Sequence, residues 1–215
     1  AVFGVFPLAR CRLQLDGDRV LDITRLDTPW DIEPEPVPLR ILSIEPDCDP
    51  SHAEPQKLLV SHGRARYSLS LHNKTALLIS LAAILRRDDP DLLLTSWGDT
   101  WLMPFLLEAC RESGLELPLN RDAGQNVLER KAHTYFSYGQ IVFRGRQTQL
   151  RGRWHLDRHN AVLWKDYGLE GVLEMARVTR QPVQEAARLS PGTGISSMQF
   201  VTALQNKILI PWHKH

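Results

Sequence analysis

The chain has 215 residues, of which 26 are Lys or Arg and 25 are Asp or Glu, so its formal net charge is +1. A chain of this length can bury one ample core, or one core with a small appended lobe. Its nearly balanced charge excludes a global basic field that attracts nucleic acid. The longest apolar run, near residues 77–85, is shorter than the roughly 18 apolar residues that a membrane span needs, so we expect no membrane partner.

The three cysteines point to a reducing compartment. Cys11, Cys48 and Cys110 are odd in number and widely spaced, and the chain has no CxxC pair. Nothing at the start of the chain resembles a secretion signal. We therefore expect free thiols and a cytoplasmic protein.

Residues 1–38 are predicted to form a small β element followed by a proline-rich linker. Polar and apolar residues alternate over 12–15 ahead of a turn at 16–18, which predicts a hairpin. Four prolines lie among acidic residues in 28–38, a composition typical of a semi-rigid linker.

Residues 39–189 are predicted to form one α/β domain. Strands are expected at 39–45, 57–61, 64–71 and 92–96, and a helix is expected from Lys74 to Arg87. A Gly-Asp turn follows the last of these strands, and Leu102, Phe105, Leu106 and Ala109 then repeat at helical spacing. Strands followed by a helix, a buried strand and another helix predict a ribonuclease-H-like mixed sheet with flanking helices.

Two further elements are expected near the C-terminus. Gly145 is the predicted turn of a hairpin flanked by Arg144, Arg146, Arg151 and Arg153. Residues 190–215 are predicted to be a helical connection that opens with the serine- and glycine-bearing turn at 190–198.

The segment from Asp89 to Glu108 reads DPDLLLTSWGDTWLMPFLLE. It resembles the second exonuclease motif of family B DNA polymerases, in which DPD and an apolar run precede Y-N-x-D-x-F-D-x-P-Y-L. On this register the family's metal-binding aspartate falls on Leu102 and its asparagine falls on Trp97. Neither side chain supplies the hard oxygen donors that Mg²⁺ requires.

The segment from Leu39 to Glu45 resembles the first exonuclease motif, an apolar strand that ends in S-F-D-I-E. Ser43 holds the aspartate position and Glu45 keeps the glutamate. An alternative register uses Asp47 or Asp49, but the prolines on both sides favour a loop. The third motif pairs a tyrosine with an aspartate four residues later, and no tyrosine of this chain meets that spacing.

The resemblance continues along the chain in the family's order. Residues 138–142 and 150–157 are similar to a hairpin that leads into a G-R-x-H-I-D strand, and residues 120–122 resemble a G-R-D segment. Residues 173–184 resemble the segment that ends the family's exonuclease domain. Together the matches cover about residues 39–211.

Metal and DNA candidates follow from these motifs. Two-metal hydrolysis needs several carboxylates, and Glu45, Asp99 and Asp157 are the remaining metal candidates. The alternatives are a strand-end carboxylate for Glu45 and a helix-capping turn for Asp99. Candidate DNA contacts are the four arginines near Gly145 together with Trp97, with Tyr138 and Trp154 nearby, because arginines interleaved with aromatics hold phosphates and stack on bases. The alternative is a solvated hairpin whose arginines protect an edge strand.

The resemblance implies the exonuclease-like part of a family B DNA polymerase, cut before the palm, that is itself inactive as a nuclease and serves structure or template binding. The parent would bind nucleotides and replicate DNA with Mg²⁺ held outside this fragment, which itself would need no cofactor. Expected partners are DNA and the palm and fingers of the same parent. Two alternatives are a working 3′–5′ proofreading exonuclease that uses Glu45, Asp47, Asp99 or Asp157, and a standalone nucleic-acid-binding module.

Overall fold

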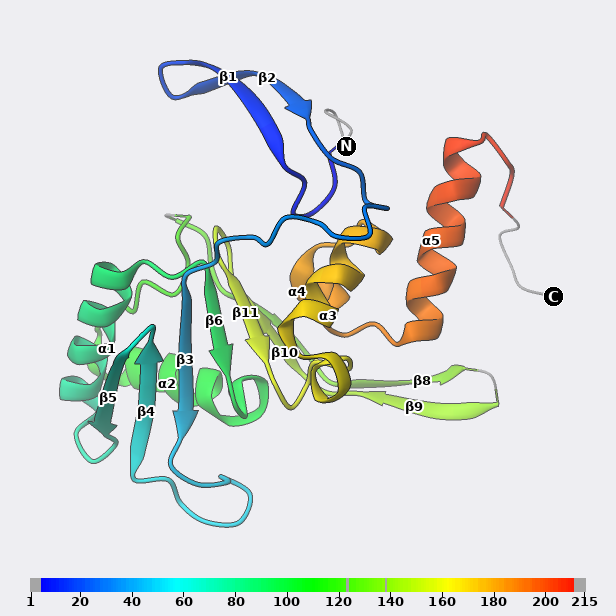
Figure 1. Ribbon diagram of the computed structural model, residues 1–215. Coiled ribbons are helices and arrows are strands. Elements are labelled where there is room, and N and C mark those ends of the chain that lie inside the picture. Colours follow the sequence, from blue (N-terminus) through cyan, green and yellow to red (C-terminus); the bar gives the residue numbers. More distant parts are fainter. Residues whose placement is uncertain (1–4, 123, 138, 211–215) are drawn as a thin grey trace. The chain divides into compact units, whose positions relative to one another are not determined.

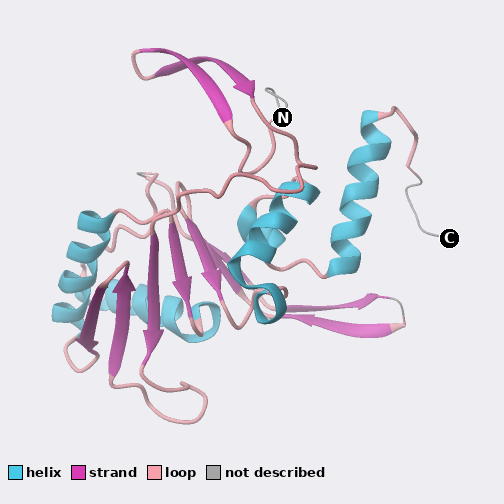
Figure 2. Cartoon of the chain, viewed as in Figure 1, coloured by secondary structure: helices cyan, strands magenta, loops and turns pink. Residues whose placement is uncertain are grey.

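The computed structural model of the chain describes residues 5–122, 124–137 and 139–210 (Figures 1 and 2). The chain divides into two compact units, one of residues 38–160 and one of residues 1–37 with 161–215. The predicted divisions at 38/39 and 189/190 stay predictions, and the structure groups residues 161–189 with the two ends of the chain. Tyr138, and residues 211–215 of the predicted connection, lie outside the described residues.

The unit of residues 38–160 contains a five-stranded mixed sheet with strand order β11-β6-β3-β4-β5. Neighbours β11, β6 and β3 are parallel, whereas β3, β4 and β5 are antiparallel. The α/β class and the mixed sheet are thus confirmed, as are the four predicted strands of this region. Their bounds are β3 Ile41–Pro46, β4 Lys57–His62, β5 Ala65–Ser70, β6 Leu92–Thr95 and β11 Trp154–Asp157.

The burial of each strand follows its sequence pattern. Alternate residues of β3 are buried, among them Leu42 and Ile44, because successive side chains point to opposite faces. All four residues of β6 are buried, as expected of a parallel strand between two neighbours. The continuous apolar run of β6 therefore marks an internal strand of the sheet.

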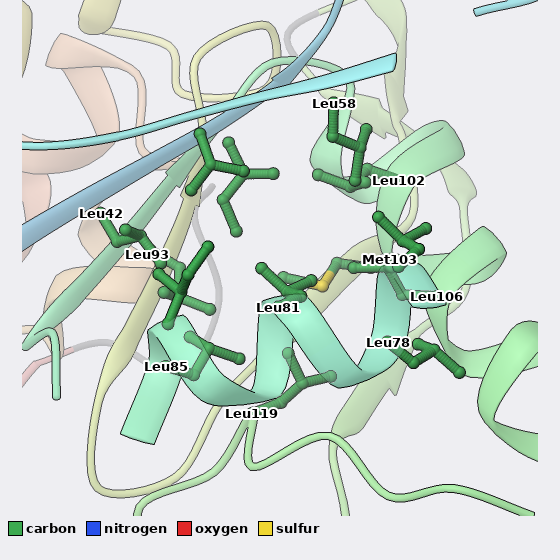
Figure 3. Packing of buried hydrophobic residues seen from close by; sticks show 14 of the residues in the cluster. Leu42, Leu58, Leu78, Leu81, Leu85, Leu93, Leu102, Met103, Leu106 and Leu119 are labelled. Carbon is green, nitrogen blue, oxygen red and sulfur yellow. The ribbon is translucent and has the colours of Figure 1, made fainter. Parts of the chain in front are cut away.

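Two helices supply most of the remaining core. The predicted helix is α1, Lys74–Asp88, and the side chain of Asn73 caps it by accepting the N–H of Ala76 at 2.9 Å. Helix α2, Met103–Ser113, follows a π-helical turn, η1, Gly98–Leu102. Figure 3 shows that leucines of α1, including Leu81, lie near Leu102 at the end of η1 and Met103 at the start of α2. This cluster is the core of the unit.

Two small ribbons complete the unit, and they correct one prediction. Strand β7, Leu128–Arg130, pairs with β10, Gln147–Gln149, whereas β8, His133–Ser137, pairs with β9, Gln140–Arg144. Gly145 therefore joins two strands that pair with different partners, and it is not the turn of a hairpin. The single-hairpin prediction failed because pairing is decided between segments distant in sequence, here β7 and β10.

The unit of residues 1–37 and 161–215 is simpler. The predicted N-terminal hairpin is confirmed as β1, Cys11–Asp16, and β2, Arg19–Arg25. The expected helix near residue 190 is α5, which starts with a cap from Ser190 to the N–H of Thr193 at 3.3 Å. The guanidinium of Arg177 donates to the carbonyl groups of Thr28 and Asp31, which holds part of the proline-rich linker. The helices of this unit are α3 Trp164–Thr179, α4 Val183–Ala186 and α5 Pro191–Gln205.

The three cysteines carry free thiols. Among the described residues, no helix combines the length and the apolar character needed to cross a membrane.

Candidate functional site at the carboxyl edge of the sheet

The three parallel strands end at the same edge of the sheet. Ile44 of β3 aligns with Thr95 of β6, and Thr95 aligns with Asp157 of β11. Open α/β sheets bind ligands at the carboxyl ends of their strands. This edge is therefore the candidate site, and it gathers the predicted positions Ser43, Glu45 and Asp157.

Glu45 and Ser43 are joined by an arginine that the sequence motifs do not include. One guanidinium nitrogen of Arg158, Nη1, lies 3.0 Å from Oε2 of Glu45, and Nη2 donates to Oγ of Ser43 at 3.1 Å. The hydroxyl of Ser96 lies 3.4 Å from the same oxygen of Glu45. The first-motif carboxylate is thus one half of an ion pair, with 41% of the Glu45 side chain and 28% of the Arg158 side chain exposed.

Leu102 lies in the hydrophobic core. It is completely buried at the junction of η1 and α2, in the cluster that also contains Leu58 and Leu106 (Figure 3). Its side chain offers no oxygen donor and is enclosed by apolar neighbours. The position that the resemblance assigns to a metal-binding aspartate therefore contributes packing.

Asp99 is buried inside η1, whose cap position is held by Trp97, so its side chain is not the helix cap that the sequence offered as an alternative. Its Oδ1 accepts the N–H of Thr148 at 2.7 Å, and its Oδ2 accepts the side-chain amide of Asn160 at 2.5 Å. Burial raises the pKa of Asp99, while the nearby His155 opposes this shift. Asp99 thereby connects η1 to β10 and to the loop that follows β11.

Both carboxylate oxygens of Asp157 also accept hydrogen bonds inside the fold. Its Oδ2 accepts the backbone N–H of Asp99 at 2.9 Å, and its Oδ1 accepts that of His159 at 3.0 Å. Asp157 therefore provides the acceptor for an N–H at the start of η1, where backbone N–H groups have no partner within the helix. A Cβ at Gly98 would lie 1.8 Å from Oγ1 of Thr95, so only glycine fits at this turn.

The donors at this edge do not fit a two-metal site. Of the carboxylates, Glu45 is paired with Arg158, and Asp99 and Asp157 accept N–H donors inside the fold. Asp47 lies in the loop after β3 and caps the N–H of Gln56 at 3.0 Å, while Asp49 accepts from Ser51. Within the described residues, no group of three or more His, Cys, Asp or Glu side chains is placed to hold a metal ion.

Trp97 lies beside the ion pair in an unusual conformation. Its φ is +53°, in the left-handed region that non-glycine residues rarely adopt. The indole stacks on the imidazole of His159, with ring centroids 4.2 Å apart and planes inclined by 24°. Trp97 is half-buried and His159 is exposed, so this aromatic pair borders the edge.

The four candidate arginines have different environments. Arg144 is half-buried over the ring of Tyr135, Arg146 pairs with Glu129 at 2.9 Å, and Arg151 is exposed. Arg153 has only 4% of its side chain exposed and donates to Asp89 and to the carbonyl of Pro118. This placement gives Arg153 a structural role, because a buried guanidinium cannot reach a phosphate in solvent.

A separate cavity of about 570 Å³ lies against the end of α2 and the loop that follows it. Its lining includes Cys110, Leu117, Asn120 and Val127. None of the predicted metal or DNA residues lines it, so the candidate site remains the carboxyl edge.

Comparison with known proteins agrees with the motifs. No family model matches the chain. A DNA polymerase of Pyrococcus glycovorans is 27% identical over 95 residues, which are 42% of this chain and 11% of that protein. DNA polymerase 1 of Pyrococcus abyssi is 28% identical over 98 residues, 44% of this chain and 11% of that protein. The solved family B DNA polymerase of the hyperthermophilic archaeon Pyrobaculum calidifontis matches with a TM-score of 0.62 and 16% identity, covering 99% of this chain and 36% of that one.

The chain resembles family B DNA polymerases. The fold likeness extends over nearly the whole chain, whereas the matched segments span about a tenth of the curated polymerases. The chain therefore corresponds to only part of a polymerase of this kind.

Arg158 is the site residue that the comparison with family B polymerase motifs missed. It is the first residue after β11, and its backbone N–H donates to the carbonyl of Thr95 at 2.9 Å. A residue that follows a parallel strand lies at the edge where ligands bind. This general rule could have indicated that Arg158 lies at the edge. It could not have indicated its partner Glu45, which is 113 residues away in sequence.

Proposed function

We propose that residues 38–160 form a ribonuclease-H-like domain of a family B DNA polymerase whose exonuclease site no longer operates and whose remaining role is structure and DNA contact. One observation carries the loss of nuclease function. The two positions where the resemblance places metal-binding aspartates are a core leucine, Leu102, and a serine, Ser43, while the surviving Glu45 is paired with Arg158. A set of this kind cannot hold two cations about 3.5–4 Å apart.

The β8–β9 ribbon supports a role in DNA contact. Opposite residues of the pair share a face, so Phe136, Ile141 and Phe143 lie on one face and are 74%, 79% and 68% exposed. The other face carries Tyr135 with the guanidinium of Arg144 5.4 Å from its ring centroid. Aromatic rings and arginines in such an arrangement suit the bases and phosphates of a single strand.

By the same resemblance, we propose that the parent protein is a DNA polymerase. DNA synthesis would belong to residues outside these 215, with Mg²⁺ steadying the phosphates of the incoming nucleotide. The palm and fingers of the parent would be the protein partners of this region.

The loss of nuclease activity is tested on a labelled single-stranded oligonucleotide with Mg²⁺ or Mn²⁺. We expect no degradation beyond that of the Glu45→Ala variant, which reports contaminating nuclease. Degradation by the wild-type chain that disappears in Glu45→Ala would contradict the proposal and establish a working exonuclease.

DNA contact is tested by fluorescence anisotropy of a labelled single strand over a series of salt concentrations. The double variant Arg144→Ala with Arg146→Ala is expected to weaken binding and to reduce the slope of log affinity against log salt by about 0.7 for each phosphate that the variant no longer neutralises. Arg64→Ala, in the exposed β4–β5 turn, is the matched control. Equal affinities and slopes for all three proteins would remove Arg144 and Arg146 from the DNA interface.

A further inference from the structure

We propose that the guanidinium of Arg158 replaces a divalent cation at the carboxyl edge of the sheet, closing the edge to metal ions while keeping Glu45 neutralised. The inference deepens the proposed function and rests on it, because it explains how an exonuclease-derived edge stays folded without metal.

The backbone fixes the direction of the side chain. The N–H of Arg158 extends the parallel ladder to the carbonyl of Thr95, so the residue starts from a defined position at the end of β11. From there the guanidinium spans β6 and reaches both Glu45 and Ser43 on β3, at 3.0 and 3.1 Å. Arginine suits this task because its planar fork presents several donors in a fixed geometry.

The negative charge of Glu45 is already neutralised by the Arg158 guanidinium, and Ser43 and Ser96 add only neutral hydroxyls around this pair. A divalent cation would have to displace Arg158 and then remain close to its positive charge, which repels it. It would also find few oxygen ligands, because Asp157 accepts two N–H donors of the fold.

Metal binding is the direct test, and it needs no DNA. Titration calorimetry with Mn²⁺ alone compares the wild-type chain, Ser43→Asp, and Ser43→Asp combined with either Arg158→Lys or Arg158→Leu. Arg158→Lys keeps the positive charge and Arg158→Leu removes it. We expect no binding by the wild-type chain and at least about tenfold tighter Mn²⁺ binding by the Arg158→Leu combination than by the Arg158→Lys combination.

A matched control tests whether the effect on Mn²⁺ binding is specific to Arg158 or follows from the loss of another arginine. Ser43→Asp with Arg151→Leu removes an exposed arginine from the same unit and is expected to bind Mn²⁺ no better than Ser43→Asp alone. Two results overturn the proposal: Mn²⁺ binding by the wild-type chain that Glu45→Gln abolishes, or equal Mn²⁺ affinities of the folded Arg158→Lys and Arg158→Leu combinations.

Circular dichroism shows whether each variant is folded. If the Arg158→Leu combination does not fold, Arg158→Gln takes its place, and a thermal unfolding cycle of Glu45→Gln, Arg158→Gln and both supplies a second measurement. We expect the unfolding midpoint of the double variant to fall no further than that of the less stable single variant. A fall equal to the sum of the two single-variant falls would overturn the pairing. Failure of DNA binding would leave these metal and unfolding results unchanged, so the two proposals fail separately.

Discussion

In the interior of the unit of residues 38–160, Oδ1 of Asp99 lies 3.6 Å from Nδ1 of His155, and almost nothing of either side chain is exposed. Nδ1 donates to the carbonyl of Thr148 at 2.7 Å, and Nε2 of the same ring lies 2.8 Å from Oγ1 of Thr95. The pair links η1 to β6, β10 and β11. Its polar groups have partners inside the fold, which limits the cost of burying them.

The pH dependence of stability is expected to reflect the protonation of Asp99. Because burial raises its pKa, the folded chain keeps the Asp99 proton at pH values where the unfolded chain, with a pKa near 3.9, has lost it. The contribution of Asp99 to stability is therefore present below about pH 4 and is lost as the pH rises through the folded-state pKa. Urea unfolding of the wild-type chain and Asp99→Asn over a pH series should show the wild type losing stability relative to the variant as the pH rises. A difference that stays constant would contradict this expectation.

Asp91 should show the opposite dependence. Hydrogen bonds from Arg40, with further donors from Arg121, lower the pKa of Asp91. Its contribution is thus present above about pH 4 and is lost as the pH falls through the folded-state pKa. We expect Asp91→Asn to cost about 2 kcal/mol of unfolding free energy at neutral pH and much less in acid. Glu54→Gln, at an exposed loop position, is the control, and a cost that does not change with pH would count against the ion pairs.

Restoring an aspartate at position 102 is not expected to restore a metal site. Leu102 is completely buried among apolar side chains, so Leu102→Asp places an unpaired charge in the core and should cost about 3–5 kcal/mol. The conservative change Leu102→Met should cost less than about 1.5 kcal/mol. Urea unfolding measures both. A stably folded Leu102→Asp variant that degrades single-stranded DNA in Mn²⁺ would refute the structural role of Leu102.

Gly98 should tolerate no side chain. A Cβ at this position would lie 1.8 Å from Oγ1 of Thr95 and 2.6 Å from Nε2 of His155, so Gly98→Ala pushes against the hydrogen bond between Thr95 and His155. We expect a loss of more than about 2 kcal/mol, since overpacking and a broken hydrogen bond add together. Gly192→Ala is the matched control, because nothing lies within 4 Å of its Cβ and alanine favours a helix. Similar unfolding midpoints for the two variants would show that η1 adapts readily.

Local patterns predicted the regular elements well. The leucines of residues 77–85 repeat at helical spacing and lie on the buried side of α1, and the strands predicted at 39–45 and 64–71 end within two residues of the observed ends of β3 and β5. The exonuclease-like motifs also predicted the resemblance to family B DNA polymerases. These features succeed because periodicity and turn chemistry act between residues close in sequence.

The sequence by itself determined the strand and helix order, the absence of oxygen donors at Leu102 and Trp97, and the polymerase resemblance. Only the tertiary structure decided that Arg158 pairs with Glu45, that Asp99 and Arg153 are buried, and that β9 and β10 have different partners. Each of these outcomes depends on contacts between residues far apart in the chain. Their geometry exists only after the sheet has brought the ends of its parallel strands together.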